Sequence, residues 1–78
     1  MKILKEDLII FLNQYNNFEL LLDDTLKIHL FKNNNLIECE LKQKNKNGRY
    51  NIIYCFKPNK NINKILQAIN ILFDIELI

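Results

Sequence analysis

The chain has 78 residues, of which 49% are hydrophobic and 26% are charged, and its formal net charge is +2. This length fits one domain, residues 1–78, with one core, and the single Gly and single Pro argue against disorder and against a disulfide-stapled miniprotein. A charge of +2 is too small to indicate a polyanionic partner. Because the sequence has neither a membrane-length apolar run nor a signal-peptide pattern, we expect a cytoplasmic protein.

The first element in chain order is an amphipathic helix. The i, i+3, i+4, i+7 spacing is followed by Leu8, Phe11, Leu12 and Tyr15, with Leu4 one turn earlier. Asn16 and Asn17 predict its end, because Asn tolerates the left-handed conformation of a C-cap. Residues 18–22 fit either a short strand or a further helical turn, and residues 23–25 predict a turn in both cases.

Two β-hairpins are predicted next. Residues 26–31 would pair with residues 36–41 around a two-residue turn at Asn33 and Asn34. One face then carries only apolar pairs, which are Leu30–Ile37, Ile28–Cys39 and Leu26–Leu41. The opposite face carries the pairs Lys27–Glu40, His29–Glu38 and Phe31–Leu36. A one-residue slip would mix the two faces, so the alternation favours this phase.

The second hairpin has the stronger turn signal, Asn47-Gly48, which suits a type I′ turn. That turn sets Leu41 opposite Tyr54, Cys39 opposite Phe56 and Gln43 opposite Ile52. A four-residue loop over residues 45–48 would shift the pairs by two and keep the faces. In both cases the predicted buried side is Tyr50, Ile52, Tyr54 and Phe56, and Pro58 ends the strand.

The last element is a helix with Asn59 or Asn61 as its N-cap. Its apolar stripe consists of Ile62, Ile65, Leu66, Ile69, Leu72 and Phe73. The element order is therefore a helix, an antiparallel meander of three or four strands, and a helix. We expect an α+β fold in two layers, with both helices on one face of the sheet.

Residues that could carry catalysis or bind a metal are few. Cys39, Cys55 and His29 have no metal-ligand spacing, and alternation directs the two cysteines to opposite faces. The chain has no Ser, one Thr and one Gly, too little for an oxyanion hole or a phosphate loop. We therefore expect no enzymatic activity, no metal, no cofactor and no disulfide. We expect His29 to pair with Glu38, which would raise the pKa of His29 modestly.

With both helices on one face, the other face of the sheet is open to a partner. It mixes apolar and charged side chains, a composition compatible with protein binding. The candidate protein-binding residues are Lys27, His29, Phe31, Leu36, Glu38, Glu40, Lys42, Ile53 and Lys57, with Cys55 among them. The leading hypothesis is a non-enzymatic protein-binding module.

Basic residues provide an alternative hypothesis. Lys44, Lys46 and Arg49 surround the second hairpin turn, and Lys57, Lys60 and Lys64 surround the start of the last helix. Both groups could contact phosphates. The element order resembles that of double-stranded RNA-binding domains, in which a Lys-rich helix start contacts RNA. The Gly-Pro-x-His loop and the Lys-Lys-x-Ala-Lys run of that family are absent from this chain.

Residues 8–15, 26–56 and 62–73 also follow the element order of some small phage-encoded anti-CRISPR proteins. This resemblance implies an inhibitor that blocks a larger protein, a CRISPR effector, by occlusion. The chain departs from the strongly acidic inhibitors that mimic DNA, so the resemblance implies a protein surface as target. A third hypothesis is a self-associating structural subunit, in which a second helical stripe forms a homodimer contact or a wider core: Ala68, Ile71, Ile75 and Ile78.

Overall fold

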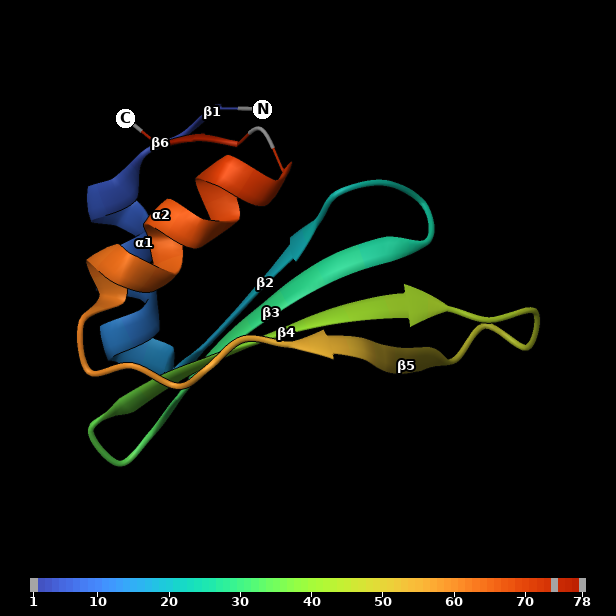
Figure 1. The fold of residues 1–78 in the computed structure, drawn as a ribbon, viewed down its shortest axis with the longest axis horizontal. Helices are drawn as coiled ribbons and strands as arrows, with labels where there is room; N and C mark the ends of the chain where they lie inside the picture. Colours follow the sequence, from blue (N-terminus) through green and yellow to red (C-terminus); the bar gives the residue numbers. More distant parts are fainter. Residues whose placement is uncertain (1, 74, 78) are drawn as a thin grey trace.

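The computed structural model describes residues 2–73 and 75–77. The elements are β1 (Lys2–Ile3), α1 (Lys5–Tyr15), β2 (Asn17–Leu21), β3 (Leu26–Asn33), β4 (Leu36–Lys44), β5 (Tyr50–Cys55), α2 (Ile62–Phe73) and β6 (Glu76–Leu77). Strands β2 to β5 form an antiparallel sheet in chain order, and both helices pack on one face of it (Figure 1). The predicted α+β fold is confirmed. A short parallel pairing of β1 with β6 near the chain ends was not predicted.

The first helix ends where the sequence predicted. Asn16 adopts the left-handed conformation with a φ of 56°, and its N–H donates to the carbonyl of Leu12 at 2.8 Å. The chain then enters β2, which pairs antiparallel with β3. Phe18 and Leu20 of this strand pack against the core. The strand interpretation of residues 18–22 is therefore the correct one of the two alternatives.

The connection between β2 and β3 is held by one carboxylate. Oδ1 of Asp23 accepts hydrogen bonds from the backbone N–H of Thr25 at 2.7 Å, from the Thr25 hydroxyl at 3.0 Å and from the N–H of Leu26 at 2.8 Å. The hydrogen bond from the Thr25 N–H is the largest cause of a lowered pKa of the Asp23 carboxyl. This Asx geometry confirms the predicted turn at residues 23–25.

The first hairpin differs from the prediction by two residues in register. Leu30 lies opposite Cys39 and Ile28 opposite Leu41, and Asn34, with a φ of 58°, occupies the turn. The predicted turn at Asn33 and Asn34 is therefore one residue too early. A shift of two residues leaves every side chain on its face, because the period of a strand is two. The apolar alternation could not distinguish the two registers.

The second hairpin closes through a three-residue loop. The N–H of Asn45 donates to the carbonyl of Arg49 at 2.8 Å, and the N–H of Gly48 donates to the carbonyl of Asn45 at 3.1 Å. Gly48 has a φ of +80°, the left-handed position that such a loop reserves for Gly. The loop is therefore one residue longer than the predicted type I′ turn and one residue shorter than the four-residue alternative, so both predictions are wrong.

A β-bulge in β5 follows from the odd loop length. Leu41 lies opposite Tyr54 as predicted, but Lys42 lies opposite Ile52, so that Ile53 is the extra residue. Gln43 consequently faces Asn51 instead of the predicted Ile52. A bulge of one residue reverses the facing of the strand beyond it.

The reversal corrects the predicted buried side of β5. Phe56 is buried, and Tyr54 lies on the same, helix-covered side with its ring 5.1 Å from that of Phe56. Tyr50 instead lies on the far side, where the ammonium of Lys27 sits 4.1 Å from its ring centroid. Ile52 shares that side because it lies opposite Lys42.

The second helix begins at an Asn cap, as expected. Oδ1 of Asn61 accepts the N–H of Asn63 at 2.9 Å, which satisfies one of the free donors of the first turn. Leu72 departs from the predicted stripe, because it is 59% exposed. The core contains Leu8, Leu12, Ile28, Leu30, Ile37, Cys39, Phe56, Ile65, Leu66, Ile69 and Ile75.

Two isoleucines of α2 provide a matched test of this core. Ile69 is 3% exposed and Ile71 is 74% exposed. We expect Ile69→Ala to lower the free energy of unfolding by about 2–5 kcal/mol, because it leaves a cavity. Ile71→Ala should change it by less than about 0.5 kcal/mol. Urea denaturation measures both, and equal losses would contradict the helix orientation.

Candidate functional site

The face of the four-stranded sheet opposite the helices, here called the outer face, is the candidate site. No helix of the described residues covers it (Figure 1). Strand alternation and the pairing register place on it Asn17, Glu19 and Leu21 of β2, Lys27, His29, Phe31 and Asn33 of β3, Leu36, Glu38, Glu40, Lys42 and Lys44 of β4, and Tyr50, Ile52 and Cys55 of β5.

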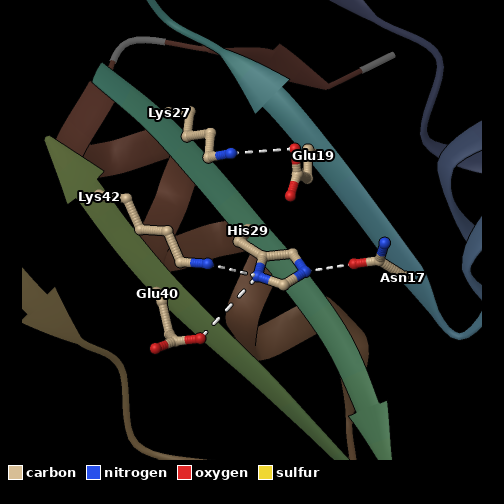
Figure 2. Close-up of polar contacts among 6 residues, drawn as sticks. All are labelled: Asn17, Glu19, Lys27, His29, Glu40 and Lys42. Atoms are coloured by element: carbon tan, nitrogen blue, oxygen red, sulfur yellow. Dashed lines mark hydrogen bonds and ion pairs between the residues drawn. The ribbon is translucent and has the colours of Figure 1, made fainter. Parts of the chain in front are cut away.

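His29 lies at the centre of a polar network on this face (Figure 2). The ammonium of Lys42 donates to Nδ1 of His29 at 3.1 Å, while Nε2 donates to Oδ1 of Asn17. An ammonium can only donate and an amide oxygen can only accept, so this geometry selects the neutral imidazole with its proton on Nε2. The carboxylate of Glu40 stands 3.9 Å from Nδ1.

Lys27 connects both edges of the outer face. Its ammonium donates to Oε2 of Glu19 at 3.1 Å and also lies over the ring of Tyr50. The hydrogen bond from Lys27 is the largest cause of the lowered pKa of Glu19. Lys27 lies directly opposite Lys42, an unfavourable pairing of like charges. The two ammonium groups point to different acceptors, which relieves their repulsion (Figure 2).

The expected environment of His29 is wrong in both partner and direction. The two-residue register shift places Glu40 opposite His29, in place of the predicted Glu38. The pKa of His29 is lowered below its ordinary value of 6.5, first by desolvation and next by the positive charge of Lys42. The carboxylates of Glu19 and Glu40 oppose this shift and do not outweigh it.

The structure brings together eight of the predicted protein-binding residues, seven on β3 and β4 and Cys55 on β5. Two of them are in contact, since the ring centroids of His29 and Phe31 are 5.0 Å apart. The seven are Lys27, His29, Phe31, Leu36, Glu38, Glu40 and Lys42. Ile53 is not among them, because the bulge places it beside Leu41 and Tyr54 in a pocket on the helix side. Lys57 lies beyond the end of β5.

Apart from Asn33 and Lys44 at the hairpin ends, five residues of the outer face were not among the predicted protein-binding residues. Asn17, Glu19 and Leu21 were missed because residues 18–22 had no settled secondary structure, although the alternation of Phe18 and Leu20 with Glu19 was a signal for a strand. Tyr50 and Ile52 were assigned to the buried side because the alternation of apolar and polar residues does not reveal a bulge.

The two predicted groups of basic residues lie at opposite ends of the molecule. Lys44, Lys46 and Arg49 are exposed around the β4–β5 loop, at the far right of Figure 1. Lys57, Lys60 and Lys64 are exposed around the start of α2, on the left. The structure therefore does not join them into one continuous basic surface.

The stripe predicted for self-association is not formed as a surface. Ile75 is 1% exposed and belongs to the core, and it is not part of a helical stripe because α2 ends at Phe73. Ala68 is half-buried against the same core. Ile71 is exposed, and Ile78 lies outside the described residues.

The two cysteines are free thiols on opposite faces of the sheet, as alternation predicted. Cys39 is buried and Cys55 is exposed. Burial raises the pKa of the Cys39 thiol to about 12, so it stays protonated at neutral pH. Among the described residues, no three His, Cys, Asp or Glu side chains are grouped so as to hold a metal ion.

The environment of the single His can be tested by titration. We expect an NMR titration of His29 to give a pKa below 6.5, because burial and Lys42 disfavour the imidazolium. Lys42→Met should raise this pKa and Glu40→Gln should lower it further. A wild-type value above 6.5, or shifts of the opposite sign, would contradict the network.

The same titration has a consequence for stability. The unfolded chain, with the higher His29 pKa, binds more protons below pH 6.5 than the folded chain does. The contribution of His29 to the free energy of unfolding is therefore lost as the pH falls from above 6.5 through the folded pKa. We expect Lys42→Met to reduce this loss in urea unfolding measured on both sides of pH 6.5.

Comparisons with known proteins indicate neither a family nor a function for this chain. No family model matches this sequence, and neither the curated proteins nor the solved structures include a match. In the part of the chain that the structure describes, no helix has both the length and the apolar character needed to span a membrane.

Proposed function

We propose that this protein is a non-enzymatic protein-binding module that blocks a larger partner by occlusion, with the outer face as its contact surface. One observation carries the proposal: the outer face has no helix over it among the described residues, yet its polar side chains are already held by one another (Figure 2). Side chains that are fixed before binding lose little entropy when a partner docks.

The composition of the outer face favours a protein as partner. Leu21, Leu36 and Ile52 are exposed around the polar network, which gives the mixture of apolar contacts and ordered polar groups found in protein interfaces. Glu19 and Glu40 stand within the network, and their carboxylates would repel phosphates. A nucleic acid is therefore a poorer fit to this face than a protein surface.

The resemblance in element order to small phage-encoded anti-CRISPR proteins supports a finer form of the proposal. In that form, the protein is an inhibitor encoded by a phage or mobile element, and the larger partner is a CRISPR effector. The near-neutral charge favours docking on a protein surface of the effector over competition for its nucleic-acid channel.

RNA binding is the second candidate function, and it is favoured by a different observation. Lys57, Lys60 and Lys64 are all exposed around the start of α2, and the first turn of that helix contains no acidic residue. Positive charge near the positive end of a helix dipole is suited to phosphate contacts. This surface is separate from the outer face, so the two candidates can be tested with different variants.

Capture from lysate of the source cell, with matched variants, tests the protein-binding proposal. Leu21→Asp puts a charge on an exposed apolar position of the outer face, and Ile10→Asp makes the same kind of change on the exposed side of α1. We expect the first to abolish capture of a stoichiometric protein and the second to retain it. Capture lost with Ile10→Asp and retained with Leu21→Asp would assign binding to the helix side.

Nuclease treatment and salt distinguish the RNA-binding candidate. If the protein binds a partner through the outer face, capture survives nuclease and changes little with salt. An RNA complex would instead be lost on nuclease treatment, and its log K would fall with log salt concentration by a slope of about 0.7–0.9 per phosphate contact. Lys60→Ala and Lys64→Ala would each reduce that slope, so a steep slope that responds to these variants would overturn the protein-binding proposal.

A further inference from the structure

The charged residues are divided unevenly along the chain. Residues 41–73 contain seven of the eleven basic residues and none of the nine acidic ones. Lys42 is held in the polar network of the outer face. The other six are exposed around the β4–β5 loop or around the start of α2: Lys44, Lys46, Arg49, Lys57, Lys60 and Lys64. Strand β5 lies between these two places, so it has a basic group beyond each end (Figure 1).

β5 itself is an uncharged strand at the edge of the sheet. Within the described residues, no strand pairs with it on the side away from β4. Of the features that keep natural edge strands unpaired, β5 has the bulge at Ile53 and neither a charged residue nor a Pro. All of its residues after Tyr50 are exposed. Its outward backbone groups are therefore accessible to another strand.

The hydrogen bonds to β4 identify these backbone groups. The N–H of Phe56 donates to the carbonyl of Cys39 at 2.9 Å, and the carbonyl of Arg49 accepts the N–H of Asn45 at 2.8 Å. Along an antiparallel strand, successive residues direct their N–H and C=O groups alternately toward the neighbour and away from it. Counted from Phe56 and from Arg49, the residues that direct them to the open edge are Cys55, Tyr50 and Ile52.

An apolar pocket adjoins the same edge on the helix side. It has a volume of about 430 Å³ and is lined by Leu41, Ile53, Tyr54, Leu72 and Phe73. An added strand would direct every second side chain to the helix side of the sheet, where apolar side chains can enter this pocket. The strand that suits this edge is therefore apolar in its middle.

The two basic groups determine what suits the ends of such a strand. β5 has 6 residues, which span about 20 Å, so a strand paired along it reaches a basic group at either end. Acidic residues at both ends are complementary to these groups. Glu40 lies opposite Cys55, but its carboxylate is turned toward His29, 3.9 Å away (Figure 2).

Three other occupants fit this edge less well. A second copy would place a basic end of its own β5 beside a basic end of this one in either strand direction, which is unfavourable. A nucleic acid carries its charge evenly along the backbone, whereas β5 has no cation between its ends. A membrane would leave the outward N–H and C=O groups without partners. We propose that the β5 edge binds an extended peptide segment of another protein, apolar in the middle and acidic at both ends, by strand addition.

Fluorescence anisotropy with synthetic peptides tests the proposal. The probe alternates Ile and Thr over the length of β5 and carries Asp residues at both ends. One control has Lys at both ends, and another has Pro in the middle, which cannot donate to a ladder. We expect each control to bind about tenfold more weakly than the Asp-ended probe, or weaker still. No binding of the Asp-ended probe, or equal binding of the Lys-ended one, would overturn the proposal.

Matched variants locate the probe on β5. Arg49→Glu and Lys57→Glu reverse a charge beyond either end of the strand, and Lys2→Glu makes the same change at an exposed position of β1. We expect each of the first two to weaken the Asp-ended probe by about fivefold and to strengthen the Lys-ended control. Lys2→Glu should change neither, and an equal response in all three variants would contradict the site.

Amide hydrogen exchange in the wild-type protein tests the strand pairing without relying on any variant. The Asp-ended probe should slow exchange at Tyr50, Ile52 and Cys55, which direct their N–H groups to the open edge. Phe56, already bonded to Cys39, should change little. Slowing confined to β2, or none in β5, would overturn the proposal.

Other ligand classes and the outer face are tested in the same assay. Tighter binding of an oligouridine or of vesicles containing anionic lipid than of the Asp-ended probe would overturn the peptide proposal. The β5 edge is separate from the contact surface of the proposed function, so Leu21→Asp should leave binding of the probe unchanged. A protein that captures its partner through the outer face and does not bind the probe would overturn this proposal alone.

Discussion

Two helices of 11 and 12 residues can cover only one face of a four-stranded sheet, and the rest of the structure depends on this limit. All the core residues lie between the helices and that face or at its margin. The outer face has no second layer to pack against among the described residues. It is stabilised instead by side chains that lie along the sheet and hold one another through charge-assisted hydrogen bonds.

The hydrogen bonds of His29 relieve the repulsion between the opposed ammonium groups of Lys27 and Lys42. Two ammonium groups directly opposite each other need separate acceptors. Lys27 turns to Glu19 on β2, and Lys42 turns to an imidazole nitrogen on β3. A neutral imidazole can accept from an ammonium and donate to the Asn17 amide at the same time, whereas a carboxylate could only accept. The network thereby connects three adjacent strands, and the contact of Lys27 with Tyr50 extends it to the fourth.

Periodicity predicted the helices, the strand faces and the two-layer arrangement, because burial imposes a period on each of these elements. It failed where the period carries no information. A register shift of two residues preserves every face, so the alternation could not reveal that His29 lies opposite Glu40. A bulge inserts one residue without changing composition, so Tyr50, Ile52 and Ile53 were each assigned to the wrong side. β2 was left unsettled because five residues are too few to distinguish a strand from a helical turn.

The bulge, which the sequence did not predict, also divides the side chains of β5 between the outer face and the pocket on the helix side. Beyond Ile53 toward the hairpin loop, Tyr50 and Ile52 contribute to the outer face, while Ile53 and Tyr54 line the pocket on the helix side.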